Sequence, residues 1–183
     1  MNREEALKLL NEKIKNQNLI KHSLAVEACL KDLALNFKEN EEKWALAGLL
    51  HDIDYEETKE DTQKHSLVGA EMLEKIGLEK EITEAVKTHN EAHGIAPETK
   101  LAKSLYCVDP LTGLIVAATL VLPSKKINDL TVENVLNRFG EKSFARGAKR
   151  EIILKCSEIS LSLEQFIGIC LKAMQGISNQ IGL

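Results

Sequence analysis

Residues that interrupt regular structure are scarce in this chain. Among its 183 residues there are ten glycines and three prolines, and aromatic residues make up 4%. Leucine, alanine, glutamate and lysine, which favour helices, are abundant. The composition therefore predicts helices joined by short turns and leaves almost nothing for strands.

Long apolar runs are also missing. No stretch of 18 consecutive apolar residues occurs, so no segment is expected to span a membrane. The first ten residues include two basic and two acidic side chains, unlike the apolar centre of a signal peptide. We therefore expect a cytoplasmic protein without a membrane partner.

Basic residues are not in excess. Lysine and arginine number 24 and aspartate and glutamate number 28, which gives a net charge of -4. Such a chain has no general attraction for nucleic acid or for an anionic membrane surface. We expect a small phosphate ester as the partner and no nucleic acid, while the oligomeric state stays open.

Cysteines are few and widely spaced. Cys29, Cys107, Cys156 and Cys170 each lie in an apolar helical context, and no CxxC or CxxxC spacing occurs. Isolated cysteines of this kind behave as small hydrophobic residues more often than as ligands or disulfide partners. We therefore predict that all four are buried and free.

The length and the balance of residue types fit one globular unit. A chain of 183 residues can bury roughly 70% of its unfolded surface, so it needs no disulfide or metal to fold. Apolar residues make up 44% and charged residues 28%. We predict a single all-α domain over residues 1–183, a bundle of about seven to nine helices. Its core is expected at about 19–122 and its C-terminal helices at about 131–177.

Apolar residues that recur every three to four positions predict where the helices lie. The second predicted helix is expected to turn an apolar stripe inward that includes Leu35. Thr99 is expected to cap the long helix that contains Pro110, and Gly77 to close an earlier one. The predicted ranges are about Glu4–Lys15, 19–35, Glu41–Leu50, His65–Lys75, Glu79–His89, Lys100–Leu122, Val132–Phe139, Ser143–Cys156 and Leu163–Met174.

The adjacent pair His51-Asp52 follows the most hydrophobic helix of the N-terminal half. Neighbouring side chains on a helix project about 100° apart, so they can meet at one ion only at a helix end, close to the backbone. An imidazole and a carboxylate together suit Zn, Mn or Fe. A protein has little reason to desolvate an Asp beside a His without a cation. The pair therefore indicates a metal site.

The five histidines indicate a metal site only when their joint pattern is considered. A lone His near an apolar stripe is more often a hydrogen-bonded core or surface residue than a ligand, and His93 keeps that interpretation. The order of His22, the pair His51-Asp52 and the distant Asp109 resembles the signature of the HD superfamily of metal-dependent phosphohydrolases. This resemblance implies that these four residues hold a metal ion in an all-helical fold.

A second likeness covers the C-terminal half. The runs Val108–Leu114, Pro123–Lys126 and Lys142–Arg150 resemble small stand-alone HD proteins named after a His-Asp-Ile-Gly motif, so that the resemblance spans about Leu19 to Met174. Here the fourth motif position is Asp54 instead of Gly. We expect that change to affect only the shape and charge of the loop beside the site.

The segment His65–Ala70 resembles the third histidine motif of the two-metal HD branches, which include phosphodiesterases of cyclic dinucleotides. In those branches this His and one from the next helix, here best matched by His89, hold a second metal that shares the Asp of the pair. The chain lacks the Gly-rich, Tyr-Pro motif of the cyclic di-GMP branch. The resemblance implies one or two divalent ions (Mn, Fe, Zn, Ni or Co), with Asp52 as the bridging ligand.

The implied chemistry is hydrolysis of a phosphate ester by a metal-activated hydroxide, with His51 and Asp52 at the reacting centre. Asp54, or else Glu56, is a candidate general acid for the leaving group. Further phosphate donors are expected from basic side chains at i, i+3 and i+4 of one predicted helix face, for which the alternative is a solvated basic surface. These side chains are Arg146, Lys149 and Arg150.

Two other functions stay open at this point. Some HD-like folds hold two irons with the same His and Asp set and activate oxygen. Others have lost their ligands and act as non-catalytic sensor modules, although every expected ligand is present here. Among substrates, nucleotide monophosphates, cyclic nucleotides and other phosphate esters are all compatible, because the loops Tyr55–Lys64 and Asn90–Glu98 would set specificity.

Overall fold

The computed structural model describes residues 1–183 and is built from helices without strands. Eight α-helices have nine residues or more, which agrees with the predicted all-α bundle. They are α1 (Arg3–Lys13), α2 (Gln17–Phe37), α3 (Glu41–Leu50), α5 (Leu67–Lys75), α6 (Lys80–Thr88), α7 (Lys100–Leu120), α8 (Val132–Gly140) and α10 (Leu163–Gly176). The short helices are α4 (Tyr55–Thr58), α9 (Arg150–Ile153) and α11 (Ser178–Ile181), with 3-10 helices at Glu91–His93, Ile127–Asp129 and Leu154–Ile159.

Local sequence explains where several helices begin and end. The Thr99 side chain accepts a hydrogen bond from the Ala102 N–H at the start of α7, as predicted. Asn40 caps α3 in the same way through the Lys43 N–H. Gly77 follows the end of α5 with a φ of 82°, a left-handed conformation that glycine adopts without strain.

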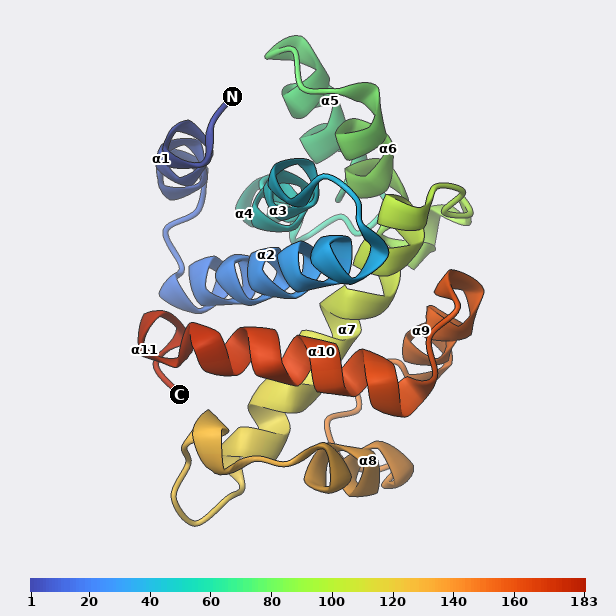
Figure 1. Ribbon diagram of the computed structural model, residues 1–183. Helices are drawn as coiled ribbons and strands as arrows, with labels where there is room; N and C mark the ends of the chain where they lie inside the picture. Colours follow the sequence, from blue (N-terminus) through green and yellow to red (C-terminus); the bar gives the residue numbers. More distant parts are fainter.

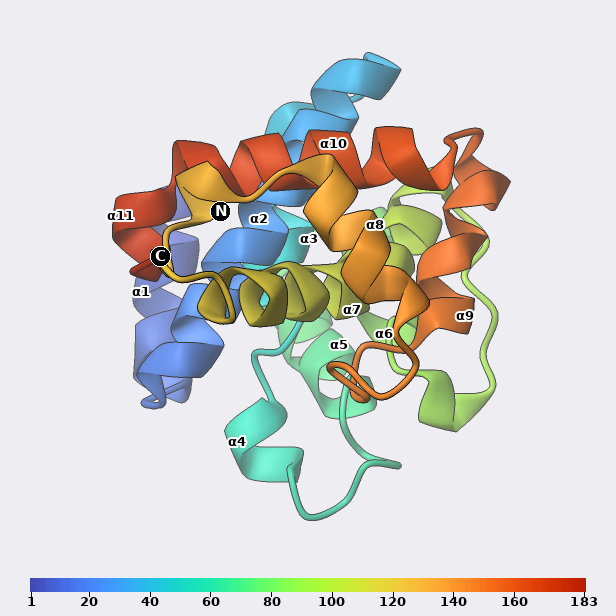
Figure 2. The ribbon, with the colours of Figure 1, turned by 90° about the horizontal axis from the view of Figure 1, so that it is seen from below.

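The helices pack around one apolar core. Helix α10 runs alongside α2, and α7 crosses behind them (Figure 1). The buried apolar side chains form one cluster that extends from Ala6 to Ile181, so the C-terminal helices share the core of the N-terminal ones. Helix α4 and the loop after it project from the body of the molecule (Figure 2).

Helices α2 and α3 approach each other unusually closely at Gly48. A Cβ atom added there would lie 2.8 Å from the Glu27 Cα, a distance that real Cβ atoms do not show. Glycine therefore permits the backbone contact between these two helices. That contact brings the start of α2 beside the end of α3, where the metal-site candidates lie.

One helix, α7, is long and apolar enough to cross a membrane by length and composition alone. The most apolar 18-residue window of this helix is 67% buried inside the protein. A buried core helix of this length meets the same criterion, so the finding is weak evidence for a membrane span.

The inward face of α2 was predicted incorrectly at one position. Leu35 is 63% exposed, whereas Val26, Leu30 and Leu33 are fully buried. Leu35 follows Leu33 by two positions, which places it about 200° around the helix from that buried stripe. The apolar stripe therefore continues along the helix without Leu35.

The predicted helix over Ser143–Cys156 is also wrong. Residues 142–147 form turns, and only the four residues of α9 and the 3-10 helix after it are helical. The physical reason is the Arg150 guanidinium, which donates hydrogen bonds to six backbone carbonyls at 2.6–3.5 Å. In this segment the Arg150 side chain therefore supplies hydrogen bonds to backbone carbonyls that would accept from backbone N–H groups in a regular helix. These carbonyls belong to Arg138, Phe139, Glu141, Phe144, Ala145 and Ala148.

The four cysteines are free and buried, as predicted. Burial raises the pKa of the Cys107 thiol to about 12, and burial also raises the pKa values of Cys156 and Cys170. A thiol is reactive as its thiolate, so these raised pKa values keep the three side chains inert at neutral pH.

Candidate metal centre

Four imidazoles from four parts of the chain converge at the junction of the long helices. His22 lies on α2, His51 ends α3, His65 precedes α5 by two positions, and His89 ends α6. His51 and His89 are buried, and His22 and His65 are partly exposed. The Nε2 atoms of all four lie within 4 Å of a carboxylate oxygen of Asp52.

The two histidines at helix ends are oriented by the carbonyls of their own helices. His51 Nδ1 donates to the Gly48 carbonyl at 2.8 Å, and His89 Nδ1 donates to the Val86 carbonyl at 2.6 Å. Each carbonyl lies three residues earlier, in the last turn of its helix, where the usual i+4 backbone donors are lost. Because Nδ1 carries the proton, Nε2 presents its lone pair to the centre.

The other two histidines are oriented by side chains. The Thr112 hydroxyl donates to the Asp109 carbonyl at 2.8 Å and accepts from His22 Nδ1 at 3.2 Å. His65 Nδ1 donates to Asp54 Oδ1 at 3.0 Å. Partners that hold one ring nitrogen and free the other are typical of metal-binding histidines.

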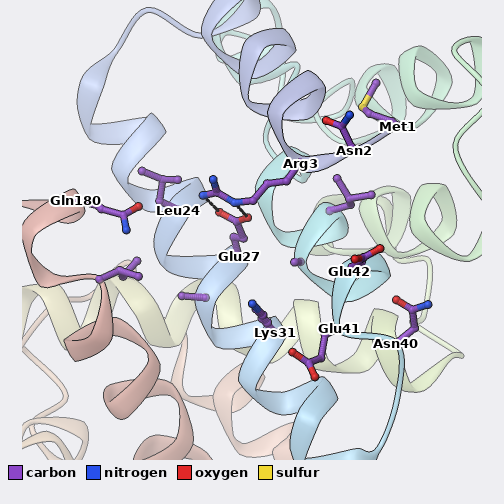
Figure 3. Close-up of a pocket in the computed structure, with 14 residues that line it drawn as sticks. Met1, Asn2, Arg3, Leu24, Glu27, Lys31, Asn40, Glu41, Glu42 and Gln180 are labelled. Carbon is purple, nitrogen blue, oxygen red and sulfur yellow. Dashed lines mark hydrogen bonds and ion pairs between the residues drawn. The ribbon is translucent and has the colours of Figure 1, made fainter.

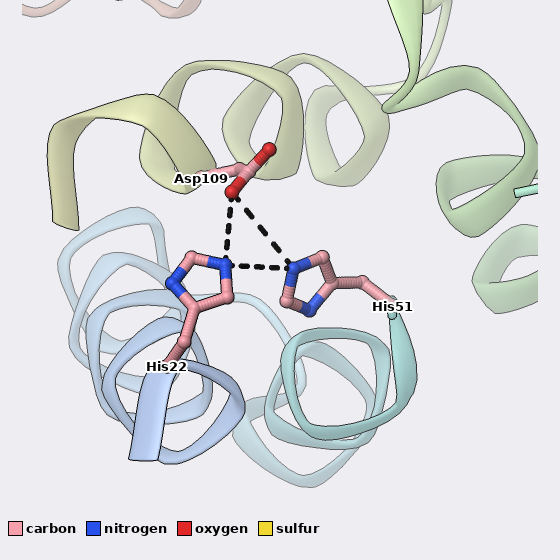
Figure 4. A group of neighbouring side chains, drawn as sticks. All are labelled: His22, His51 and Asp109. Atoms are coloured by element: carbon pink, nitrogen blue, oxygen red, sulfur yellow. Dashed lines mark hydrogen bonds and ion pairs between the residues drawn. The ribbon is translucent and has the colours of Figure 1, made fainter. Parts of the chain in front are cut away.

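Figure 4 shows how His22, His51 and Asp109 face one another from three helical segments. The Asp109 Oδ1 atom lies 3.0 Å from His22 Nε2 and 3.9 Å from His51 Nε2, and the two Nε2 atoms are 3.2 Å apart. These three ligand atoms lie within 4.8 Å of one another, close enough to bind one ion. His51, Asp52 and His89 form a second group that meets the same distance limit.

Asp52 lies between two pairs of histidines. Its Oδ2 atom lies 3.4 Å from His51 Nε2 and 3.7 Å from His22 Nε2. Its Oδ1 atom lies 3.3 Å from both His65 Nε2 and His89 Nε2. The two oxygens of one carboxylate therefore face two separate sets of donors.

These donors fit a divalent metal. Ligands that bind one ion at about 2.1 Å with tetrahedral or octahedral angles lie about 3.0–3.4 Å apart, close to the spacings seen around Asp52. His89 Nε2 is buried and has no hydrogen-bond partner. An orphaned, buried ring nitrogen that faces a carboxylate is the arrangement a cation would complete.

Burial and the neighbouring carboxylates shift the pKa values of the imidazoles in opposite directions. Burial lowers the pKa of His51 to about 4, so this ring is neutral at pH 7. Burial opposes the charged form of His65 too, but its hydrogen bonds with Asp52 and Asp54 raise its pKa to about 10. For His22, burial is outweighed by Asp109 and Asp52, which raise the pKa. Without metal, protons therefore supply the positive charge in this centre.

The two carboxylates stay ionised. Burial alone would raise the pKa of Asp52, but its interactions with the surrounding imidazoles, with His51 first and then the hydrogen-bonded His65, hold the pKa well below the usual value. Burial acts in the same direction on Asp109, and its hydrogen bond with His22 reverses the effect and lowers the pKa. Both groups are therefore anionic at neutral pH, as metal ligands must be.

Asp54 and Glu56, the candidate general acids, are engaged elsewhere. Asp54 is 1% exposed, and its two oxygens accept from His65 and from backbone N–H groups. Glu56 accepts from the N–H groups of Lys15 and Asn16. Asp54 therefore presents no free oxygen to a leaving group, and Glu56 is held just before α2 through its Oε1 atom.

The basic cluster does not form the shared helix face that its spacing suggested. Arg150 is saturated with backbone carbonyls, and Lys149 pairs with Glu91. Arg146 is exposed in the turns that precede α9. Only Arg146 keeps a side chain free for an anion.

One cavity of the molecule adjoins the metal centre. It measures about 330 Å³ and is lined by His22, Asp109 and small residues, among them Gly113, Ala145 and Gly147. A second cavity measures about 660 Å³ and lies between α1, α2, α3 and α11 (Figure 3). It contains no histidine, and the Arg3 guanidinium neutralises its buried carboxylate, Glu27.

Sequence reasoning missed the residues that orient the ligands. Thr112 follows Asp109 by three positions, a helical spacing that could have indicated its contact with the same histidine. His93, given no metal role, makes hydrogen-bond contacts with the His65 carbonyl at 2.6 Å and the Ser66 hydroxyl at 3.0 Å. It therefore holds the loop that carries His65.

The model of the HD domain matches residues 19–114, more than half of the chain. The chain belongs to the HD domain family. The matched range includes every histidine and aspartate of the metal centre, and HD proteins are metal-dependent phosphohydrolases as a class. None of the solved structures matches this HD protein.

Curated relatives carry the name Ribonuclease Y. That of Lawsonia intracellularis is 31% identical over 157 residues, which are 84% of this chain and 30% of the relative. That of Geobacter sulfurreducens is 31% identical over 157 residues, which are 83% of this chain and 29% of the relative. The chain thus spans about 30% of the length of the curated relatives it matches.

Proposed function

We propose that this chain is a phosphohydrolase that holds two divalent ions and cleaves a small phosphate ester. The observation that carries the proposal is the position of Asp52, whose two oxygens face two different pairs of histidine Nε2 atoms. Asp52 would bridge the ions. The first ion would also bind His22, His51 and Asp109, and the second His65 and His89.

When bound, such ions lower the pKa of a water molecule at the site and neutralise phosphoryl oxygens. The protein contributes orientation, because Gly48, Val86, Thr112 and Asp54 hold the four imidazoles with Nε2 inward. Preformed ligands cost little reorganisation on binding. The donor set suits Mn, Fe, Zn, Ni or Co.

The substrate would enter through the cavity beside His22 and Asp109. Small residues from the turns before α9 leave room there for an ester group. Arg146, exposed between two of the lining residues, would bind phosphate oxygens. These turns lie outside residues 19–114, the range that the HD family model matches, yet they line the same cavity as His22 and Asp109. We therefore propose that residues 1–183 act as one domain.

The substrate class rests on charge. A net charge of -4 favours a small ester, such as a nucleotide, over a long polyanion. The name of the curated relatives supports an RNA phosphodiester as the second candidate. Short RNA therefore belongs in any substrate screen.

The test is hydrolysis by metal-free protein reconstituted with each of the five metals in turn. Nucleoside monophosphates, cyclic nucleotides and short RNA are offered, with metal content measured on the same samples. We expect metal-dependent release of product from one ester class. Oxygen uptake by the iron form without ester cleavage would instead favour an oxygenase, and metal binding without either reaction would favour a sensor module.

A further inference from the structure

The carboxylate of Asp54 is completely enclosed by donors. Its Oδ2 atom accepts from the Ser66 N–H at 2.8 Å and from the Gly69 N–H at 2.9 Å, and its Oδ1 atom accepts from His65 Nδ1 at 3.0 Å. The side chain is fully buried. A buried anion with three donors is fixed in position and orientation.

Two of these donors begin helix α5. Ser66 is the N-cap residue of α5, yet its own side chain makes no capping bond. Asp54 supplies the acceptor that the first turn of α5 needs, in place of a local cap. Ser66 has a φ of 71°, unusual for a residue with a side chain, and this conformation aims its N–H at Asp54.

Gly69 leaves space for the carboxylate. A Cβ atom added to Gly69 would lie 3.1 Å from Asp54 Cγ and 3.2 Å from Oδ1, tighter than most real contacts. The loop, the start of α5 and Asp54 are therefore fitted to one another. A glycine at position 54, as in the His-Asp-Ile-Gly motif, would offer none of these contacts.

We propose that Asp54 is the positioning residue of the second metal site, fixing His65 so that Nε2 faces the shared carboxylate of Asp52. This inference rests on the proposed two-metal function. Asp54 itself touches neither ion; it acts through His65, whose Nε2 lies 3.3 Å from Asp52 Oδ1.

The substitution Asp54→Asn separates positioning from capping. The amide oxygen can still accept from Ser66 and Gly69, so α5 keeps its cap. The amide nitrogen then faces His65 Nδ1 and donates to it, which moves the imidazole proton to Nε2 and blocks the ligand atom. Loss of an outer partner of this kind weakens metal binding by about 10–100-fold.

The experiment is a Mn²⁺ titration of metal-free protein, followed by calorimetry and by electron paramagnetic resonance. Asp54→Asn should bind the first ion as the wild type does and the second about 10–100-fold more weakly, with an unchanged helical content by circular dichroism. Asp54→Gly should weaken the second ion and also lower the melting temperature. Thr58→Ala removes a hydrogen bond to the Asp54 carbonyl and is the matched control that keeps both ions.

Wild-type affinity for both ions in Asp54→Asn would overturn the positioning role while leaving the two-metal function intact. One ion in the wild type, unchanged in His65→Ala, would instead remove the second site and both proposals with it. If Asp54→Asn fails to fold, ¹⁵N NMR of the Zn²⁺-loaded wild type decides. The proposal requires a protected proton on His65 Nδ1, and a proton on Nε2 contradicts it.

Discussion

The two sides of the metal centre use the same residue types in opposite surroundings. On the cavity side, the side chains of His22 and Asp109 are 23% and 33% exposed. On the inner side, those of His65 and His89 are 14% and 2% exposed. The cavity side is therefore accessible to a substrate, whereas the metal-binding side chains of the inner side are enclosed and fixed in position. We therefore expect substrate to approach the first ion, and the second ion to exchange more slowly.

Removal of the residue common to both sides should have the largest effect. Asp52→Ala should lose most bound metal and reduce ester hydrolysis by roughly a thousandfold or more, about 4 kcal/mol of barrier. Helical content should stay nearly unchanged, because the core folds without metal. Metal analysis, circular dichroism and a phosphodiester assay check this, with the exposed Asp129→Ala as control. Full metal occupancy in Asp52→Ala would contradict the bridging role.

Single substitutions should remove the metal ion from one side of the centre at a time. His65→Ala and His89→Ala should each bring the metal to protein ratio toward one and retain the first ion, because its ligands are intact. His22→Ala should lose the first ion and keep the second. All three should slow hydrolysis severely, by about 100-fold or more. Equal loss of both ions in all three variants would show that the two sides bind metal as one unit.

The turns before α9, which line the cavity beside His22 and Asp109, are held together by the Arg150 guanidinium. Arg150→Met removes one donor from each of six carbonyls, three of which keep a backbone N–H donor, and should destabilise the protein by about 2–4 kcal/mol. The turns that line the cavity should loosen, so KM should rise as well. Arg146→Met in the same segment is the matched comparison: it should raise KM and change stability by less than about 0.5 kcal/mol. Melting curves and kinetics that show the reverse order would refute this division.

A pH series should distinguish the buried from the paired imidazoles in metal-free protein. The stabilisation from charged His65, with a pKa raised to about 10, is present below about pH 6.5 and lost as the pH rises toward 10. The pKa of His51 is lowered to about 4, so keeping it neutral becomes costly as the pH falls from 6.5 toward 4. The melting temperature should therefore peak near pH 6.5.

Added Mn²⁺ should raise the melting temperature more at pH 8.5 than at pH 6, because protons compete for the ligand nitrogens. His65→Gln should flatten the alkaline part of the metal-free curve and leave the acidic part. An unchanged alkaline slope in His65→Gln would assign that slope to another group.

Much of this centre could be predicted because its residues form short local motifs or follow one another in a recognisable order along the sequence. The pair His51-Asp52 marks a helix end, and the spacing of apolar residues gives most helices. The turns before α9 could not be predicted, because Arg150 gathers carbonyls from Arg138 to Ala148 and a helical repeat does not encode such contacts. The acidic residue at Asp54 was visible beside the metal motif, but its partners lie 11 to 15 positions away.

Anomalous diffraction from crystals soaked with Mn²⁺ at neutral pH tests the central claim most directly. The proposed function requires two anomalous peaks, one on each side of Asp52. One should lie near His22, His51 and Asp109, and the other near His65 and His89. A single peak with His65 turned away from it would contradict the two-metal centre.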